Sequence, residues 1–185
     1  MDGYAIELGF APKASAKIAK IGLNVAAAGL HYEYVDDGNK PHLTLAAFES
    51  TVDADRLAAV TAEFARTLSP FDITFTSIAQ FATAQNVIYL APLITADLFA
   101  IYQGFQDVLA AAQLEPGFYH RPGSWVPHTT ITMKGPKTDL GPTMEIVRKA
   151  PVFNRPMRLD HINLVWYPPF KFIDRFELQG GQKKI

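Results

Sequence analysis

Apolar and polar residues alternate over the first ten positions of the chain. Tyr4, Ile6, Leu8 and Phe10 are large and apolar, and the residues between them are small or charged. A period of two is typical of a strand with one buried face. The pattern therefore predicts a strand over residues 4–10.

Beyond this strand, segments with the apolar period of a helix alternate with segments that have the period of a strand. The pattern predicts helices capped by Ser15, Asp53, Thr95 and Asp139, and strands over 42–48, 71–79, 87–93, 128–133, 157–167 and 170–178. Residues 35–40 resemble a turn, and residues 118–126 are expected to form a loop. Strands and helices are thus mixed along the whole chain.

The same order of elements occurs twice. The Pro-His pairs at His42 and His128 lie 86 residues apart (128 − 42), and the caps Asp53 and Asp139 have the same offset (139 − 53). A nearly constant offset indicates a duplicated strand-helix-strand-helix-strand unit.

The duplication predicts the domain organisation. We expect an α+β fold in which residues 1–185 form a single bilobal domain, with lobe-forming repeats over about 1–82 and 83–178 and a flexible tail at 179–185. Two α+β lobes that face each other would leave a cleft between them. Such a cleft is a natural place for a functional site.

Composition and charge narrow the function classes. The 185 residues are 49% hydrophobic and 19% charged, which is typical of a folded globular protein. The formal net charge of −1 leaves no large basic field, so binding to long nucleic acid is disfavoured. Cysteine is absent, which excludes disulfides, thiolate nucleophiles and cysteine zinc sites.

The sequence also bears on location. The first residues lack the basic segment and apolar run of a signal peptide. The most apolar stretch, residues 87–102, is interrupted by Pro92, Thr95 and Asp97, so it does not resemble a membrane span. We expect no membrane association and a cytoplasmic location.

Two short motifs stand at equivalent places in the two repeats. They read Lys40-Pro41-His42-Leu43-Thr44 and Val126-Pro127-His128-Thr129-Thr130, so each is Pro-His-x-Thr. Residues i and i+2 of a strand share a face. His42 should therefore project with Thr44, and His128 with Thr130.

This pairing of residue types suits displacement at phosphorus. One imidazole can take a proton from the entering hydroxyl or water, and the other can give one to the departing oxygen. The two threonine hydroxyls can hold nonbridging phosphate oxygens, and no metal is needed. Which histidine is the acid and which is the base stays open at the level of sequence.

The paired motifs resemble those of the 2H phosphoesterase superfamily, which includes 2′–5′ RNA ligase-like proteins and cyclic phosphodiesterases. The segments Tyr4-Ala5-Ile6-Glu7-Leu8 and Trp125-Val126-Pro127-His128 extend the resemblance. It implies a bilobal fold of two pseudo-symmetric lobes of antiparallel sheet, with helices on the outside and a central cleft, and a metal-independent site without cofactors. His42 and His128 would be the acid–base pair, and Thr44 and Thr130 would hold the phosphate.

The resemblance also implies a substrate class. Members of this superfamily cleave 2′,3′-cyclic phosphates or 2′–5′ linkages, in some cases with reverse ligation. The expected partners are small cyclic nucleotides or short RNA ends.

The loop before the second motif offers further candidates. Arg121 can bind phosphate, and Tyr119 and Trp125 can stack on a base, although the same loop could simply pack on the second lobe.

Other readings of the motifs are weaker. A P-loop, a G-x-S-x-G elbow and H-E-x-x-H are all missing from the sequence, and a metal site at the two histidines lacks a carboxylate partner at the adjacent face positions. The alternative to an enzyme is a noncatalytic module of the same shape that binds a nucleotide or RNA end. A plain interaction domain, without a functional site at the two motifs, is the third hypothesis.

Overall fold

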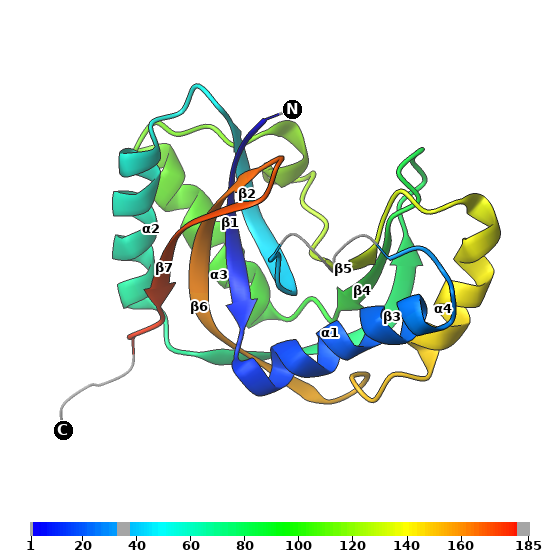
Figure 1. Cartoon of the computed structure of the whole chain (residues 1–185). Helices are drawn as coiled ribbons and strands as arrows, with labels where there is room; N and C mark the ends of the chain where they lie inside the picture. Colours follow the sequence, from blue (N-terminus) through cyan, green and yellow to red (C-terminus); the bar gives the residue numbers. More distant parts are fainter. Residues whose placement is uncertain (1, 33–37, 181–185) are drawn as a thin grey trace.

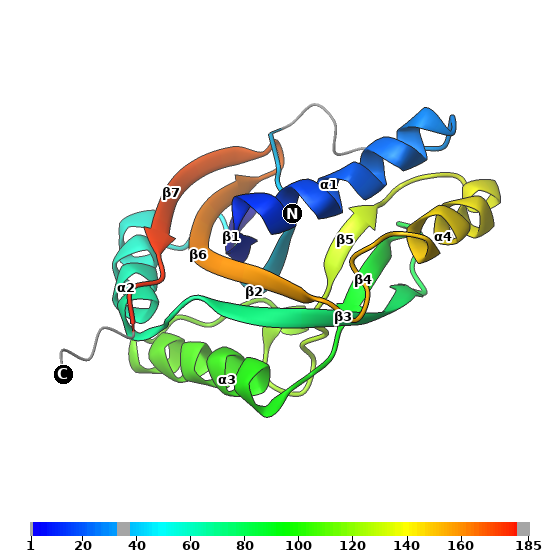
Figure 2. The same cartoon turned by 90° about the horizontal axis from the view of Figure 1, so that it is seen from below.

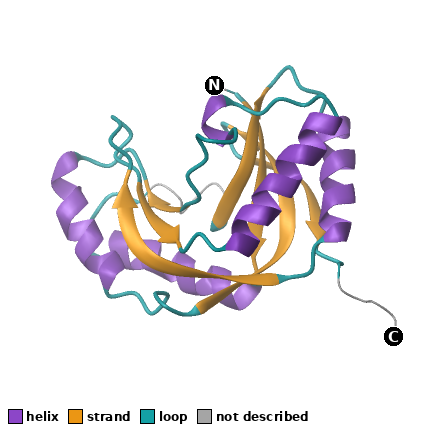
Figure 3. Cartoon of the chain, turned by 180° about the vertical axis from the view of Figure 1, so that it is seen from behind, coloured by secondary structure: helices purple, strands orange, loops and turns teal. Residues whose placement is uncertain are grey.

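A computed structural model describes residues 2–32 and 38–180 (Figures 1 and 3). The order of elements is β1 Gly3–Phe10, α1 Pro12–Ala27, β2 His42–Glu49, α2 Ala54–Thr67, β3 Phe71–Gln80, β4 Ile88–Pro92, α3 Ala96–Ala111, the 3₁₀ turn η1 Phe118–His120, β5 Thr129–Thr132, the 3₁₀ turn η2 Lys137–Asp139, α4 Leu140–Arg148, β6 Pro156–Tyr167 and β7 Lys171–Glu177. The predicted α+β class and the repeated β-α-β-α-β order are both confirmed.

Local capping chemistry explains two of the helix starts. The Asp53 carboxylate accepts from the backbone amides of Asp55 and Arg56 at the start of α2. The Thr95 hydroxyl accepts from the amide of Leu98 at the start of α3. Both satisfy amides that have no partner within the helix.

The predicted cap Ser15 is wrong, whereas Asp139 stands at the N-cap position of α4 as predicted but makes no side-chain cap hydrogen bond there. Helix α1 begins earlier, because Pro12 occupies its first turn, where a missing N–H has no cost, and Ala11 stands at the cap position. Asp139 closes η2 and passes in helical conformation into α4. Its carboxylate accepts instead from the amide of His31, on the segment after α1.

The strands form one antiparallel sheet in the order β2-β1-β6-β3-β4-β5. The remaining strand, β7, also pairs with β6, on the edge opposite β1. From one end, the sheet runs from β2, which carries the first motif, through β1 to β6, the third strand of the second repeat. From the other end, it runs from β5, which carries the second motif, through β4 to β3, the third strand of the first repeat. Strands β3 and β6 have thus exchanged places between the lobes. Each lobe contains strands from both halves of the chain, whereas the predicted halves were expected to form one lobe each.

The helices follow the same exchange. Helices α2 and α3 pack against each other on one lobe, and α1 packs against α4 and β5 on the other. Figures 1 and 2 show these pairs on the outer sides of the two lobes. A shared core of buried side chains includes Ile6, Leu8, Phe75 and Phe105. The alternation seen at the start of the chain places Ile6 and Leu8 on this buried side.

Two predicted features fall partly beyond the described residues. Residues 35–37 of the predicted turn and residues 181–185 of the predicted tail lie outside them. Within residues 2–32 and 38–180, no helix is long and apolar enough to cross a lipid bilayer.

The capping pattern makes a prediction about stability. Asp53→Ala should lower the free energy of unfolding by about 1 kcal/mol, because two amides of α2 lose their acceptor. Ser15→Ala is the matched control and should change it far less, because Ser15 lies inside α1. Urea unfolding of both variants makes the comparison, and equal losses would contradict the assignment of the caps.

Candidate active site

The two motif histidines are held in the same way. The Nδ1–H of His42 donates to the carbonyl of Lys40 at 2.8 Å, and the Nδ1–H of His128 donates to the carbonyl of Val126 at 2.7 Å. In each case the acceptor lies two residues earlier, across a proline. A residue before proline is restricted to extended conformations, which helps to aim that carbonyl. Each ring is therefore fixed with Nε2 available for proton transfer.

The two motifs face each other across the molecule. Strand β2 contacts β5, although they stand at opposite ends of the sheet order. A cavity of about 450 Å³ is lined by His42 together with Thr130, and a second cavity of about 260 Å³ is lined by His128 together with Thr44. Each cavity thus combines the histidine of one motif with the threonine of the other.

His128 lies in aromatic surroundings. Its ring meets Phe81 at a centroid distance of 4.9 Å and Tyr89 at 5.3 Å, both edge-on. Burial lowers the pKa of His128, the hydrogen bond to Val126 opposes this, and the charge of His42 lowers it further. His128 is therefore biased toward the neutral form, which can accept a proton.

His42 has a different neighbour. Its Nε2 lies 3.3 Å from Oε1 of Glu7, a side chain on the central strand β1. Glu7 is only 5% exposed, and burial raises its pKa from 4.5 to about 8. At neutral pH this carboxyl is biased toward its protonated form. Glu7 was not among the residues predicted for the site.

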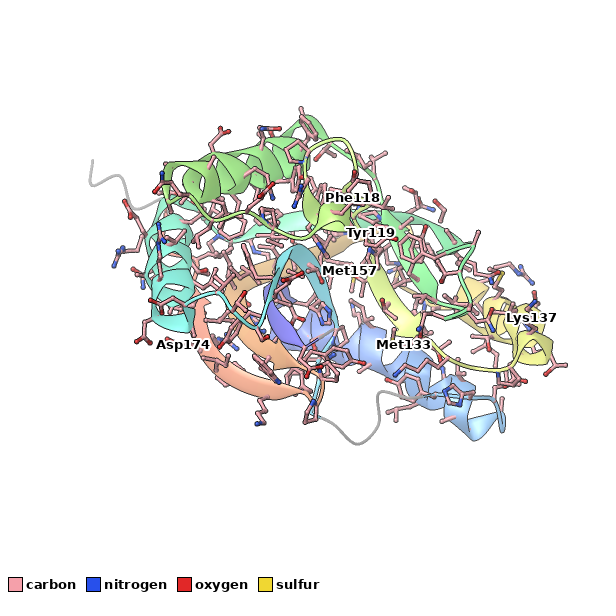
Figure 4. The ribbon with its side chains drawn as sticks, turned by 90° about the horizontal axis from the view of Figure 1, so that it is seen from above. Phe118, Tyr119, Met133, Lys137, Met157 and Asp174 are labelled. Carbon is pink, nitrogen blue, oxygen red and sulfur yellow. The ribbon has the colours of Figure 1, made fainter. Side chains whose placement is uncertain are left out.

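The three predicted loop residues divide into two groups. Tyr119 and Trp125 line the cavity beside His128, and Figure 4 shows Tyr119 next to Phe118 on the loop after α3. Arg121 lines neither cavity among the described residues. Its guanidinium instead binds the Glu115 carboxylate at 3.0 Å and the Pro116 carbonyl at 2.8 Å.

Trp125 also joins the loop to the first motif. Its indole N–H donates to the carbonyl of Thr44 at 2.9 Å, and its ring stacks on Tyr102 of α3 at a centroid distance of 4.0 Å. The Tyr102 hydroxyl donates in turn to the carbonyl of His120. The loop is thus tied to β2 and α3, and Trp125 forms part of the cavity wall.

Three further residues at the site were missed or interpreted otherwise from sequence. Phe81 was not among the residues predicted for the site and His120 lay in the predicted loop, yet both line the cavity beside His128. Burial and the charge of His128 lower the pKa of His120 to about 4. The available signal for Glu7 was the alternation in β1, which places one carboxyl on a face otherwise formed by Ala5 and Gly9.

Metal-ligating side chains do not gather anywhere in the described part of the chain. Within residues 2–32 and 38–180, no group of three or more histidine, cysteine, aspartate or glutamate side chains is placed to hold an ion.

A family model described as the 2′-5′ RNA ligase superfamily matches residues 12–168 of the chain, which include both motifs. No curated protein matches the chain.

Several solved structures have the same fold. E. coli LigT complexed with 3′-AMP has a TM-score of 0.62 at 14% identity, over 96% of this chain and 97% of LigT. TT0787 of Thermus thermophilus has a TM-score of 0.61 at 14% identity, over 97% and 100%. Usb1 of Kluyveromyces marxianus has a TM-score of 0.50 at 10% identity, over 96% and 97%. These similarities agree with the two-lobed α+β fold predicted from the motifs.

The buried carboxyl predicts a specific dependence of stability on pH. Between pH 4.5 and about 8 the folded protein keeps a proton on Glu7 that the unfolded chain has lost, so Glu7 lowers stability as the pH rises through this window. The free energy of unfolding of the native protein relative to Glu7→Gln should fall there by up to about 1.4 kcal/mol per pH unit. Urea unfolding at several pH values makes the comparison, and parallel curves would contradict it.

Proposed function

The chain belongs to the 2′–5′ RNA ligase superfamily, and we propose that it is a metal-independent phosphoesterase. In this proposal it hydrolyses 2′,3′-cyclic phosphates or 2′–5′ phosphodiesters of nucleotides or short RNA. The histidines His42 and His128 transfer the protons. The observation that carries the proposal is the crossed arrangement, in which each cavity presents one motif's histidine with the other motif's threonine.

The crossed arrangement suits a phosphate placed between the motifs. A phosphorus atom there would have one imidazole on each side, as in-line displacement requires. The Thr44 and Thr130 hydroxyls would donate to its nonbridging oxygens, which are anionic, and hydrogen bonds to charged acceptors are the stronger kind. The same residues would also serve the reverse direction, because proton donor and acceptor exchange roles when the reaction is reversed.

The different surroundings of the two histidines support separate roles in hydrolysis. His128, with its lowered pKa, would take a proton from water as the water oxygen bonds to phosphorus. His42, whose Nε2 faces the Glu7 carboxyl, would give a proton to the ribose oxygen as its bond to phosphorus breaks. One proton enters at His128 and one leaves from His42, so the charge of the site is restored by exchange with solvent.

The aromatic cavity supports a nucleotide as the substrate. Phe81, Tyr119 and Trp125 line the space beside His128, and aromatic side chains bind nucleobases by stacking. A volume of about 260 Å³ is small for a long oligonucleotide but sufficient for part of a mononucleotide. The complex of the structurally similar LigT with 3′-AMP is consistent with such a ligand.

The direct test uses nucleoside 2′,3′-cyclic monophosphates and a 2′–5′ dinucleotide as substrates, in the presence of EDTA. His42→Ala and His128→Ala should each lower kcat by about 10²–10⁴-fold, because each removes a general acid or base. His31→Ala, which removes a histidine that lines neither cavity, should keep nearly full activity.

Three results would count against the proposal in different ways. Activity that disappears with EDTA would replace it with a metal-dependent reaction. Activity untouched by either substitution would overturn the assignment of the site. Tight nucleotide binding by folded protein without turnover of any tested ester would favour the noncatalytic binding module.

A further inference from the structure

Glu7 belongs to a row of polar side chains that crosses four strands. In the register of the sheet, Glu7 of β1 pairs with Thr44 of β2 on one side and Asn163 of β6 on the other, and Asn163 pairs with Arg175 of β7. Residues paired directly across antiparallel strands share a face. The carboxyl therefore lies on the same face of the sheet as the phosphate-binding threonine of the first motif.

The contact between Glu7 and His42 requires a proton between the Glu7 carboxyl and Nε2 of His42. The Nδ1–H of His42 is already given to the carbonyl of Lys40, so Nε2 is the nitrogen that can exchange a proton with a neighbour. Oε1 of Glu7 lies 3.3 Å from that nitrogen. Two acceptors with no proton between them would repel each other, so this buried contact requires one shared proton.

The second motif has no such partner. Tyr89 of β4 pairs with Thr130 of β5, so it occupies the position that Glu7 has beside Thr44. An aromatic ring thus stands beside His128 where a carboxyl stands beside His42. The two halves thus repeat the His-x-Thr motif but place different side chains, Glu7 and Tyr89, beside its threonine.

We propose that Glu7 is a positioning residue that holds a proton on the His42 side of the site, so that His42 stays loaded for donation. This inference rests on the proposed function, since it gives the acid of that reaction its proton supply. Before substrate binds, Glu7 and His42 share one proton. During the reaction the proton on Nε2 passes to the ribose oxygen as the bond from that oxygen to phosphorus breaks. The pair is left one proton short and recovers it from solvent.

Several ionisable groups surround Glu7. His42 faces it from β2, and His161 lies on β6 beside Gly9, two residues further along the same face. A Cβ on Gly9 would come within 2.0 Å of Nε2 of His161, so the glycine is needed for that imidazole to fit.

These further groups are engaged with partners of their own. Asp160 binds Nδ1 of His161 at 2.5 Å, and Arg175 of β7 is held by Glu177 at 2.5 Å. Lys40 lines the same cavity as His42 and adds a further cation at its edge. None of these charges offsets the burial of Glu7, which raises its pKa.

The experiment follows the titration of the His42 ring by ¹H–¹⁵N NMR in the native protein and in Glu7→Gln. Glu63→Gln is the matched control, because it makes the same change on the exposed surface of α2. The pair keeps its one proton to a higher pH than a lone imidazole would, because losing that proton leaves a buried carboxylate. The midpoint at which the His42 ring responds to the loss of this proton should therefore fall by about one pH unit or more in Glu7→Gln and stay unchanged in Glu63→Gln.

Kinetics give the second readout. Between pH 6 and pH 8, the ratio of kcat/KM in Glu7→Gln to that of the native protein should fall on the order of tenfold, because His42 loses its proton earlier. A purely structural role would lower kcat/KM by the same factor at every pH. If Glu7→Gln does not fold, Glu7→Asp keeps the carboxyl one methylene further away and should show a smaller shift in the same direction.

The two measurements separate the possible failures. An unchanged His42 midpoint in Glu7→Gln would overturn the role of Glu7, whether or not the protein is an enzyme. A shifted midpoint in a protein that turns over no phosphoester would leave the shared proton established and overturn the proposed function. A shifted midpoint together with a pH-dependent loss of kcat/KM is the expected result.

Discussion

The pairing of β3 with β6 is the constraint on which the site depends. Residues 71–74 of β3 pair with residues 156–159 of β6, and the two strands then diverge into opposite lobes, where β6 pairs with β1 and β3 with β4. The lobes are thus joined by continuous backbone hydrogen bonds. The sheet bends so that its end strands β2 and β5 come into contact, which brings the two motifs together. Neither lobe can be completed by one half of the chain alone.

A symmetric frame supports an asymmetric site. The backbone treats the two histidines alike, since each donates Nδ1–H to the carbonyl two residues before it. The differences come from side chains on the neighbouring strands: a buried carboxyl at Glu7 beside His42, and the rings of Phe81 and Tyr89 beside His128. A reaction that needs one proton donor and one acceptor requires such a difference. In the proposed mechanism the strands set the position of the two imidazoles, and their neighbours set the direction of proton transfer.

Much of this arrangement was predictable from local signals. Period-two and helical patterns located the elements, and the matched Pro-His-x-Thr motifs indicated the two histidines and their threonines, because strand geometry alone places i and i+2 on one face. The exchange of β3 and β6 was not predictable, since it depends on pairing between residues more than 80 positions apart. Glu7 was missed for the same reason. The alternation of residues in β1 was visible in the sequence, but the sequence did not show that β1 pairs with β2, which carries His42.

Capping and loop roles show the same limit. Asp53 and Thr95 cap as predicted because the cap contacts residues two or three positions away. The Asp139 carboxylate instead accepts from the amide of His31, on the segment after α1, and Arg121 binds Glu115 and lines neither of the two cavities. Polar side chains with several possible partners are decided by tertiary contacts that a single sequence does not reveal.

The central claim is that one phosphate is processed by one proton donor and one proton acceptor. The most direct test is the pH dependence of kcat/KM for a nucleoside 2′,3′-cyclic phosphate in the native protein, His42→Ala and His128→Ala. The account predicts a bell-shaped profile for the native protein. The residual activity of His128→Ala should lose the acidic limb, and that of His42→Ala should lose the basic limb. A profile that keeps both limbs in either variant would contradict the account.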